Sequence, residues 1–486
     1  MASGTTNQRQ RARVMAISAI SLFAPLLAAA QMNPTASASA VRVVTLQEAV
    51  QYATAHYPAV RAAMERRNAA RARVSLARDN YLPKADVLWQ LNRGTRNNIA
   101  GTLLPQSTIP NPSGTVVDTS TQSFWGTGSG MHISWEPFDF GYRRAVVQSA
   151  QATVNRTAEQ VQLTLLDVQT AAADAALSVL AAEQSVHATQ ADVDRRTVFA
   201  RSVHALVDAH LRPGADSSRA DAELATARTQ MILAQQNAAV ARTRLAELLD
   251  LAGSEVDVAP GRLLDTPPET SLADTPASNN PLAVVEQDRV LEARARLHIL
   301  DRSYVPKFSL QAVGYGRGTG VNGNGKPAKD PNQGLLPDTP NWAAGVTVTF
   351  PIFNFASIHS RQRVERANQR REEQLYAQTV QKITGRSARA KAILESAQRI
   401  AANTPVELQA SQDAERQARA RFQAGLATLV DVAEAQRLLV NAEIDDSLAR
   451  LSIWRALERL ASAQGNLEPF LDLVQPAGVA YGPGGN

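Results

Sequence analysis

The side chains that proteins use most often for catalysis and metal binding are scattered along this sequence. None of the seven histidines belongs to an H-E-x-x-H pair; they are His56, His132, His187, His204, His210, His298 and His359. His204 and His210 are six residues apart, which does not place them on one helical face at the spacing of zinc ligands. The chain also lacks cysteine, a Gly-x-Ser-x-Gly segment and a phosphate-binding loop. We therefore expect no catalytic site, no metal site and no cofactor, and the chain is not predicted to be an enzyme.

The charged residues indicate solvated helix surfaces rather than a nucleic-acid interface. Acids and bases are interleaved, with 45 Asp+Glu against 50 Lys+Arg. This pattern is typical of i,i+4 pairing along helices, and no basic block accompanies a nucleic-acid-reading motif. Aromatic residues make up only 5% of the chain. That composition favours shallow, closely spaced helix packing over a thick aromatic core.

The longest predicted element is a helix over residues 141–210. After Gly141 the chain contains no Pro or Gly until Pro213. Apolar residues repeat in two heptad rows, which are Val154, Val161, Val168, Ala175 and Ala182, and Ala158, Leu165, Ala172, Val179, Val186 and Val193. Such a helix would be on the order of 100 Å long. It must therefore lie against similar helices in an elongated assembly.

The N-terminus has the features of a Sec-type signal peptide over residues 1–40. Three arginines precede the apolar run 14–30, and A-x-A sites follow at Ala28–Ala30 and Ala38–Ala40. No later segment approaches 18 consecutive apolar residues, so no transmembrane helix is expected in the mature chain.

The rest of the chain is predicted to consist of two tandem repeats. Both Pro58 to Pro83 and Pro281 to Pro306 span 25 residues, and each pair brackets a helix that ends before a strand. The first repeat, 41–280, is predicted to contain helices over 45–81, strands over about 84–92 and 123–135, the helix 141–210, a return helix 216–251 and a linker 252–280. The second repeat, 281–486, is predicted to contain a helix 281–304, strands over about 307–315 and 342–350, a long helix 357–423, a return helix 428–464 and a loosely ordered C-terminal tail.

The four strands alternate between apolar and small polar residues, as strands of a membrane β-barrel do. Trp125 and Trp135 share one face and would lie roughly 33 Å apart along a strand. The aromatic residues predicted to mark the membrane interfaces are Trp89, Trp125, Trp135, Trp342 and Phe350. A soluble hairpin with buried tryptophans is the alternative interpretation.

Four strands are too few to enclose a lumen, because about eight are needed for the smallest barrel. Open strand edges are not tolerated in lipid. If these strands span a membrane, several chains must contribute to one barrel.

Taken together, these motifs resemble the TolC-type outer-membrane efflux protein family over essentially the whole mature chain. They are the opening Leu46–Ala49, Tyr-x-Pro-Lys at Tyr81–Lys84 and Tyr304–Lys307, Pro137–Gly141 with its counterpart Pro351–Phe355, Arg421–Gly425, Asp431-Val432 and Ala435-Gln436. The resemblance implies a mainly α membrane protein of the α+β class. It implies a homotrimer whose three chains form a twelve-stranded barrel in outer-membrane lipid, continued by a helical barrel through the periplasm of a Gram-negative cell. It also implies a periplasmic adaptor, an inner-membrane pump and passive export, as in tripartite efflux or type I secretion.

The resemblance further places a periplasmic gate after the second helix reversal, at Asp431, Glu434 and Phe422. Three copies of the two acids would form a negative constriction that favours multivalent cations. Thr428 and Asp431 also fit a helix cap, and the two roles are compatible. Ala427 and Phe422 replace polar residues that relatives can carry, so the closed gate is expected to be held differently.

The same comparison makes the two turns candidates for adaptor docking. These residues are Leu211, Arg212, Pro213, Gly214, Gly425, Leu426, Ala427 and Thr428. The competing functional interpretation is a periplasmic coiled-coil adaptor without a channel, and a third is a soluble helical scaffold. Neither alternative requires four alternating strands at matched positions. The sequence does not identify the exported cargo.

Overall fold

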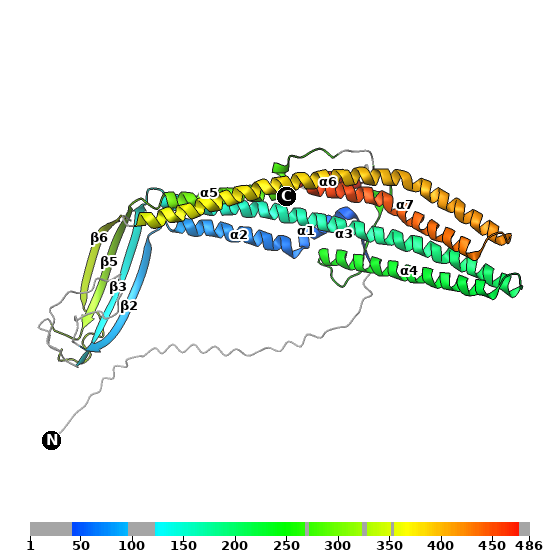
Figure 1. The fold of residues 1–486 in the computed structure, drawn as a ribbon. Coiled ribbons are helices and arrows are strands. Elements are labelled where there is room, and N and C mark those ends of the chain that lie inside the picture. The colour runs from blue at the N-terminus through cyan, green and yellow to red at the C-terminus, as the bar shows by residue number, and fades with distance from the viewer. Residues whose placement is uncertain (1–40, 96–121, 268–271, 323–327, 351–353, 476–486) are drawn as a thin grey trace, which may run out of the picture. The chain divides into compact units, whose positions relative to one another are not determined.

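The computed structural model describes residues 41–95, 122–267, 272–322, 328–350 and 354–475. The predicted signal peptide and the counterpart segment at Pro351, Ile352 and Phe353 therefore lie outside the described residues. Within Val41–Asn486 the chain is mainly helical, and Figure 1 shows the helices running lengthwise from a four-stranded sheet. The α-helices are α1 (Leu46–His56), α2 (Pro58–Asp79), α3 (Tyr142–Asp208), α4 (Gly214–Leu248), α5 (Pro281–Asp301), α6 (Phe355–Gln423), α7 (Leu429–Gln464) and α8 (Glu468–Val474). The strands are β1 (Arg42–Val44), β2 (Lys84–Thr95), β3 (Ser123–Phe138), β4 (Val256–Val258), β5 (Lys307–Thr319) and β6 (Thr339–Thr349).

The four long strands form one antiparallel sheet in the order β2-β3-β5-β6. Their register places Val87, Met131, Gly314 and Trp342 side by side, so these residues share one face of the sheet. Most large apolar side chains on this face are exposed, and Trp342 is 83% exposed. The opposite face carries small and polar residues, among them Gln90, His132, Gln311, Gly345 and Thr347. β2 and β6 are the outer strands, so each has one backbone edge without a strand partner among the described residues.

Each long helix packs along a shorter return helix. α3 pairs with α4, and α6 pairs with α7 (Figure 1). α6 continues through Pro405, which lies inside it. One window of α3 is apolar and long enough to cross a membrane by length and composition. Half of that window is buried against other helices, as is usual for the core helix of a folded domain.

The junction between sheet and α3 is fixed by Asp139 and Arg143. The Asp139 carboxylate accepts hydrogen bonds from the Gly141 and Arg143 amides and pairs with the Arg143 side chain at 2.8 Å. The Arg143 guanidinium also donates to the Asn80 carbonyl and lies 4.7 Å from the centre of the Tyr81 ring. Gly141 adopts φ +92°, a conformation that favours glycine and lets the chain turn from strand to helix.

Two segments, predicted as a linker and a loosely ordered tail, contain regular elements among their described residues, so the predictions were wrong for those parts. The linker 252–280 contains β4, which pairs in parallel with β1, and two short 3₁₀ turns, Gly261–Leu264 and Ala277–Asn279. The segment after Gly465 contains α8, whose Phe470 is fully buried against Trp454. Isolated apolar residues in these Pro- and Gly-rich stretches pack into the core formed by α1, α3 and α7. Because these residues are isolated, the sequence shows no apolar periodicity that would predict their burial.

The strands also extend further than predicted. β2 ends at Thr95 rather than about residue 92, and β3 continues to Phe138 rather than 135. β5 reaches Thr319, and β6 begins at Thr339. These strand ends contain Gly, Arg and Thr, and the alternation of apolar residues in them is weak. Hydrogen bonding to the neighbouring strand keeps them in the sheet.

Candidate functional site

The two turns predicted to act in docking and gating lie together at the helix ends remote from the sheet (Figure 1). A buried apolar cluster joins them. It contains Phe199, Ala200, Val203 and Ala220 from the first helical hairpin and Phe422, Leu429 and Val432 from the second. Phe199 and Phe422 meet at a ring-centroid distance of 5.4 Å, inclined by 58°. We call this arrangement the tip cluster.

Arg212 ties the first turn to the second. Its guanidinium lies 4.3 Å from the centre of the Phe422 ring and donates a 2.8 Å hydrogen bond to the Phe422 carbonyl oxygen. Phe422 itself is only 2% exposed. It therefore joins the two hairpins to each other within one chain.

The other predicted docking residues form the surface of the turns. Leu211, Pro213, Gly214, Gly425, Leu426 and Thr428 are exposed, whereas Arg212 and Ala427 are half-buried. Gly425 has φ +75°, which a side chain would disfavour and which allows the tight reversal after α6. Two exposed leucines, Leu211 and Leu426, are thus presented by adjacent turns.

Asp431 caps the start of α7. Its carboxylate accepts hydrogen bonds of 2.8 Å from both the amide and the hydroxyl of Thr428, and the Asp431 amide donates to the Thr428 hydroxyl. These hydrogen bonds, first that from the Thr428 amide, hold the pKa of Asp431 below its ordinary value, with a contribution from the nearby Arg421 charge. The carboxylate is therefore both a cap and a fixed negative charge at the tip.

Glu434 lies one turn further along α7 and pairs with Arg437. The two side chains form hydrogen bonds of 2.9 and 2.6 Å, and both are exposed. The Arg437 hydrogen bonds lower the pKa of Glu434, so it too is ionised at neutral pH. Asp431 and Glu434 thus present two acidic side chains per chain, although Arg437 offsets the charge of the second.

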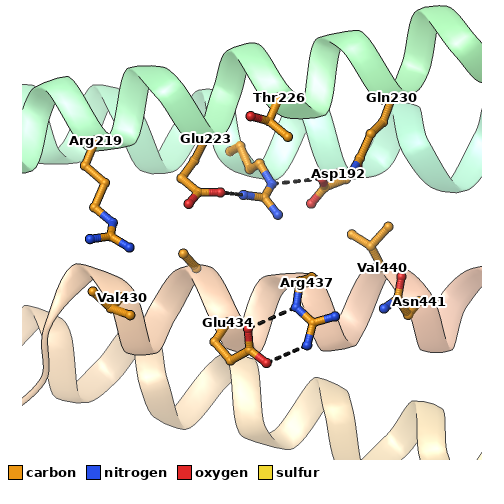
Figure 2. Close-up of a pocket in the computed structure, with 12 residues that line it drawn as sticks. Asp192, Arg219, Glu223, Thr226, Gln230, Val430, Glu434, Arg437, Val440 and Asn441 are labelled. Carbon is orange, nitrogen blue, oxygen red and sulfur yellow. Dashed lines mark hydrogen bonds and ion pairs between the residues drawn. The ribbon is translucent and has the colours of Figure 1, made fainter.

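A narrow groove of about 180 Å³ separates the two hairpins behind the tip cluster. Figure 2 shows Glu434 and Arg437 on α7 facing Glu223, Arg219 and Asp192 across it. On the far wall the buried Asp192 pairs with Arg196 at 2.8 Å, and Arg196 pairs with Glu223 at 2.9 Å.

Nearby, Arg195 forms a two-pronged ion pair with Glu443 of α7 at 2.9 and 2.7 Å. Sequence reasoning missed this network. The i,i+4 spacing of Asp192 and Arg196 was its one local signal, whereas the pairing of Arg195 with Glu443 joins residues 248 positions apart.

Residues that the register places side by side across the strands form a row of the sheet. The aromatic residues predicted to mark the membrane interfaces lie in different rows. Trp135 lies close to the helices, where its indole nitrogen donates to the Tyr81 carbonyl at 3.0 Å. Trp125 lies at the opposite end of β3, with the Arg93 guanidinium 5.1 Å from its ring centre. Trp89 and Trp342 lie in adjacent rows between them, and Phe350 is exposed just after β6.

A segment around Gly334–Asp338 covers the outer end of the apolar face. The buried Thr127 hydroxyl lies within hydrogen-bond distance of the Gly334 and Leu335 carbonyls. Gly318, the cross-strand neighbour of Thr127, has no room for a side chain because the Leu336 carbonyl lies against it. The exposed apolar band therefore runs from the Trp89 and Trp342 rows to the Phe308 row, rather than from Trp125.

A family model described as outer membrane efflux protein matches residues 49–250 and 274–466 of the chain. No curated protein matches the sequence.

Several solved structures share the fold. The chain is similar to the CmeC outer membrane channel of Campylobacter jejuni, with TM-score 0.69 and 16% identity over 86% of this chain and 85% of that one. It is similar to the outer membrane protein VceC of Vibrio cholerae, with TM-score 0.68 and 17% identity over 87% and 96%. It is also similar to the open state of the MtrE outer membrane channel of Neisseria gonorrhoeae, with TM-score 0.64 and 18% identity over 87% and 89%.

Proposed function

The chain belongs to the outer membrane efflux protein family, and we propose that three copies of it form one duct through the outer membrane and the periplasm. The family match spans both halves of the chain and confirms the family predicted from the motifs. The protein is an outer-membrane exit duct of an efflux system, located in the outer membrane and extending into the periplasm.

The observation that supports a barrel shared between chains is the four-stranded sheet, which has two open edges among the described residues and an exposed apolar face. In lipid, unpaired backbone groups at β2 and β6 would each be costly. Pairing β6 of one chain with β2 of the next removes every edge, and three chains supply twelve strands. The small and polar residues of the inner face then line a lumen.

Exposed apolar residues on the helices support the same assembly. α4 carries Ile232, Leu233 and Val240 on its surface, and α6 carries Ile400 and Val406. Packing against neighbouring copies of the chain would bury these apolar side chains and remove their surface from water. The competing function, a coiled-coil adaptor without a channel, leaves the exposed face of the sheet without a role.

The direct test is the state of the protein in fractionated cells. We expect an SDS-resistant, heat-modifiable trimer band in outer-membrane fractions. Release as a monomer with the periplasmic contents would refute the duct.

The two acids at the tip are proposed to form a cation-binding ring at the periplasmic entrance. In a trimer, Asp431 and Glu434 would contribute six carboxylates to one constriction. Replacing both by alanine should weaken block by hexamminecobalt, applied from the periplasmic side of channels in planar bilayers, by at least about tenfold, because the negative potential at the entrance is lost.

Asp445→Ala is the matched control for this experiment, since Asp445 is an exposed acid further along α7. It should leave block unchanged. Equal block of the double variant and the unmodified channel would show that the acids act only as cap and ion pair.

The exposed turns are proposed to contact the periplasmic adaptor. A photocrosslinker or cysteine placed at Leu211 or Leu426 should capture the adaptor in cells, because both leucines are exposed at the tip. The same probe at Leu76, exposed on α2, should not capture it. Capture at Leu76 alone would move the docking surface away from the turns.

A further inference from the structure

A second cavity lies where α7 ends beside the start of α5, and we call it the mid-helix cavity. Its volume is about 800 Å³, and α3, α6 and the end of α7 form its walls. Glu458, Arg459 and Ser462 of α7 border it, whereas Ile453, Leu457 and Leu460 border a separate cavity that is also lined by Thr266, Pro267 and Leu272. At 3.6 residues per turn these two sets lie on opposite faces of α7. The mid-helix cavity therefore lies on the side of α7 opposite Thr266, Pro267 and Leu272.

One buried acid in this cavity lacks a partner. Glu458 is 1% exposed, and its Oε1 atom has no hydrogen-bond donor among the described residues. Burial, followed by the neighbouring Asp174 carboxylate, raises the pKa of Glu458 to about 7, and the charges of Arg459 and Arg455 only partly oppose the rise. An unsatisfied buried carboxylate oxygen is uncommon in folded proteins because leaving it unpaired is costly. A donor brought by a bound molecule would satisfy it.

The charges of the cavity are separated between its walls. α3 contributes Asp167 and Asp174, whereas α6 contributes Arg386 and Arg389. The walls are close enough for the Arg386 charge to act on the Asp167 carboxylate, although burial still raises the pKa of Asp167. Arg459 adds a further cation from α7, and Arg455 lies 4.0 Å from Asp174.

Apolar side chains share the lining of the cavity with these charges. Leu163 and Leu166 come from α3, and Ile383 and Ile393 come from α6. The volume lies within the range of about 300–1,000 Å³ that is usual for sites that hold a drug-sized molecule. The lining of the cavity thus combines acidic, basic and apolar side chains.

We propose that the mid-helix cavity binds zwitterionic amphiphiles, with their ammonium group at Glu458 and their anionic group at Arg386 and Arg389. A purely cationic ligand would face the arginines without compensation, and a purely anionic ligand would face Asp167 and Asp174 in the same way. A ligand with both charges pairs with both walls, and its apolar body covers the leucines and isoleucines. The inference deepens the proposed export function by naming a class of cargo, and it rests on that function for the cavity's exposure to the lumen.

Three dansyl compounds with the same fluorophore and a similar chain test the proposal. They are Nα-dansyl-lysine, which is zwitterionic at neutral pH with its ammonium and carboxylate separated by the lysine side chain, dansyl-cadaverine, which is cationic, and dansyl-aminohexanoate, which is anionic. We expect the full-length protein in lipid nanodiscs to bind dansyl-lysine at least about tenfold more tightly than the other two. Empty nanodiscs give the background fluorescence. Equal affinity for the three compounds, or preference for either singly charged one, would overturn the proposal.

Two variants locate the site. Glu458→Gln keeps the shape of the side chain and removes its charge, so it should weaken dansyl-lysine by about tenfold while leaving dansyl-aminohexanoate no weaker. Arg389→Gln, at an exposed position, should weaken dansyl-lysine and dansyl-aminohexanoate but not dansyl-cadaverine. Glu395→Gln, which borders the cavity on the other face of the helices, is the control and should change nothing. Unchanged dansyl-lysine binding in both Glu458→Gln and Arg389→Gln would place the ligand elsewhere.

The same preparations separate this proposal from the proposed duct. An SDS-resistant trimer in the outer membrane that binds the three probes alike would retain the duct and reject the cavity. Absence of that trimer would reject the duct itself.

Discussion

Ala344→Arg should abolish the outer-membrane trimer, whereas Ala343→Arg should leave it intact. The two alanines are neighbours on β6, yet the register pairs Ala344 with Ala312 on the apolar face and Ala343 with Val313 on the other face. An arginine on the lipid face near the middle of a barrel costs about 2–4 kcal/mol. Three copies would apply this cost three times in one trimer.

The measurement is the amount of SDS-resistant trimer in outer-membrane fractions after equal expression. Ala343→Arg is a matched control because the residue type, the strand and the exposure are the same. The arginine of Ala343→Arg would project into the lumen. It should reduce the conductance of the channel and leave the amount of trimer unchanged. Trimer loss in both variants would mean that the strand simply does not tolerate arginine, and loss in Ala343→Arg alone would reverse the assignment of the two faces.

Arg212→Ala should open the periplasmic end of the duct. The guanidinium is both stacked on Phe422 and hydrogen-bonded to its carbonyl oxygen, so its removal frees one hairpin tip from the other. A cation–π contact and a hydrogen bond from a charged group together contribute about 2–4 kcal/mol. A loss of that size shifts an equilibrium between closed and open tips at least about tenfold. Single-channel conductance in planar bilayers should rise accordingly.

Arg219→Ala is the control, because Arg219 belongs to the same hairpin and is exposed, with no partner drawn in Figure 2. Its conductance should match that of the unmodified protein. Phe422→Leu gives a second measurement, since it retains apolar packing but removes the ring beneath Arg212, and it should shift conductance in the same direction. Unchanged conductance in Arg212→Ala and Phe422→Leu would mean that the tips are held closed by contacts between chains.

The long helices and the alternating strands could be predicted because their signals are local. The helix predicted over 141–210 runs from Tyr142 to Asp208, since a run without Pro or Gly and with a heptad repeat favours helix at every turn. The alternation in β3 and β6 likewise predicted which residues share a face. β1, β4 and α8 were missed, because each is short and is ordered by contacts with distant parts of the chain.

The roles of single side chains were less predictable. Phe422 was predicted to act at the gate, and the structure buries it beneath Arg212. Asp431 could be predicted as a cap because Thr428 is three residues away, and the structure places both in a capping box. Nothing in the neighbourhood of Glu458 indicated that its carboxylate would be buried beside Asp174.

The sequence by itself determined the helix and strand periods, the caps, the open-edged sheet that one chain cannot close, and the family. Each depends on neighbours within a few turns or on recurring motifs. Only the tertiary structure decided that Arg212 meets Phe422, that Arg195 meets Glu443, and that acidic and basic walls face each other across one cavity. Those contacts join residues more than 200 positions apart, and they exist only once helix packing has brought separate segments into one register.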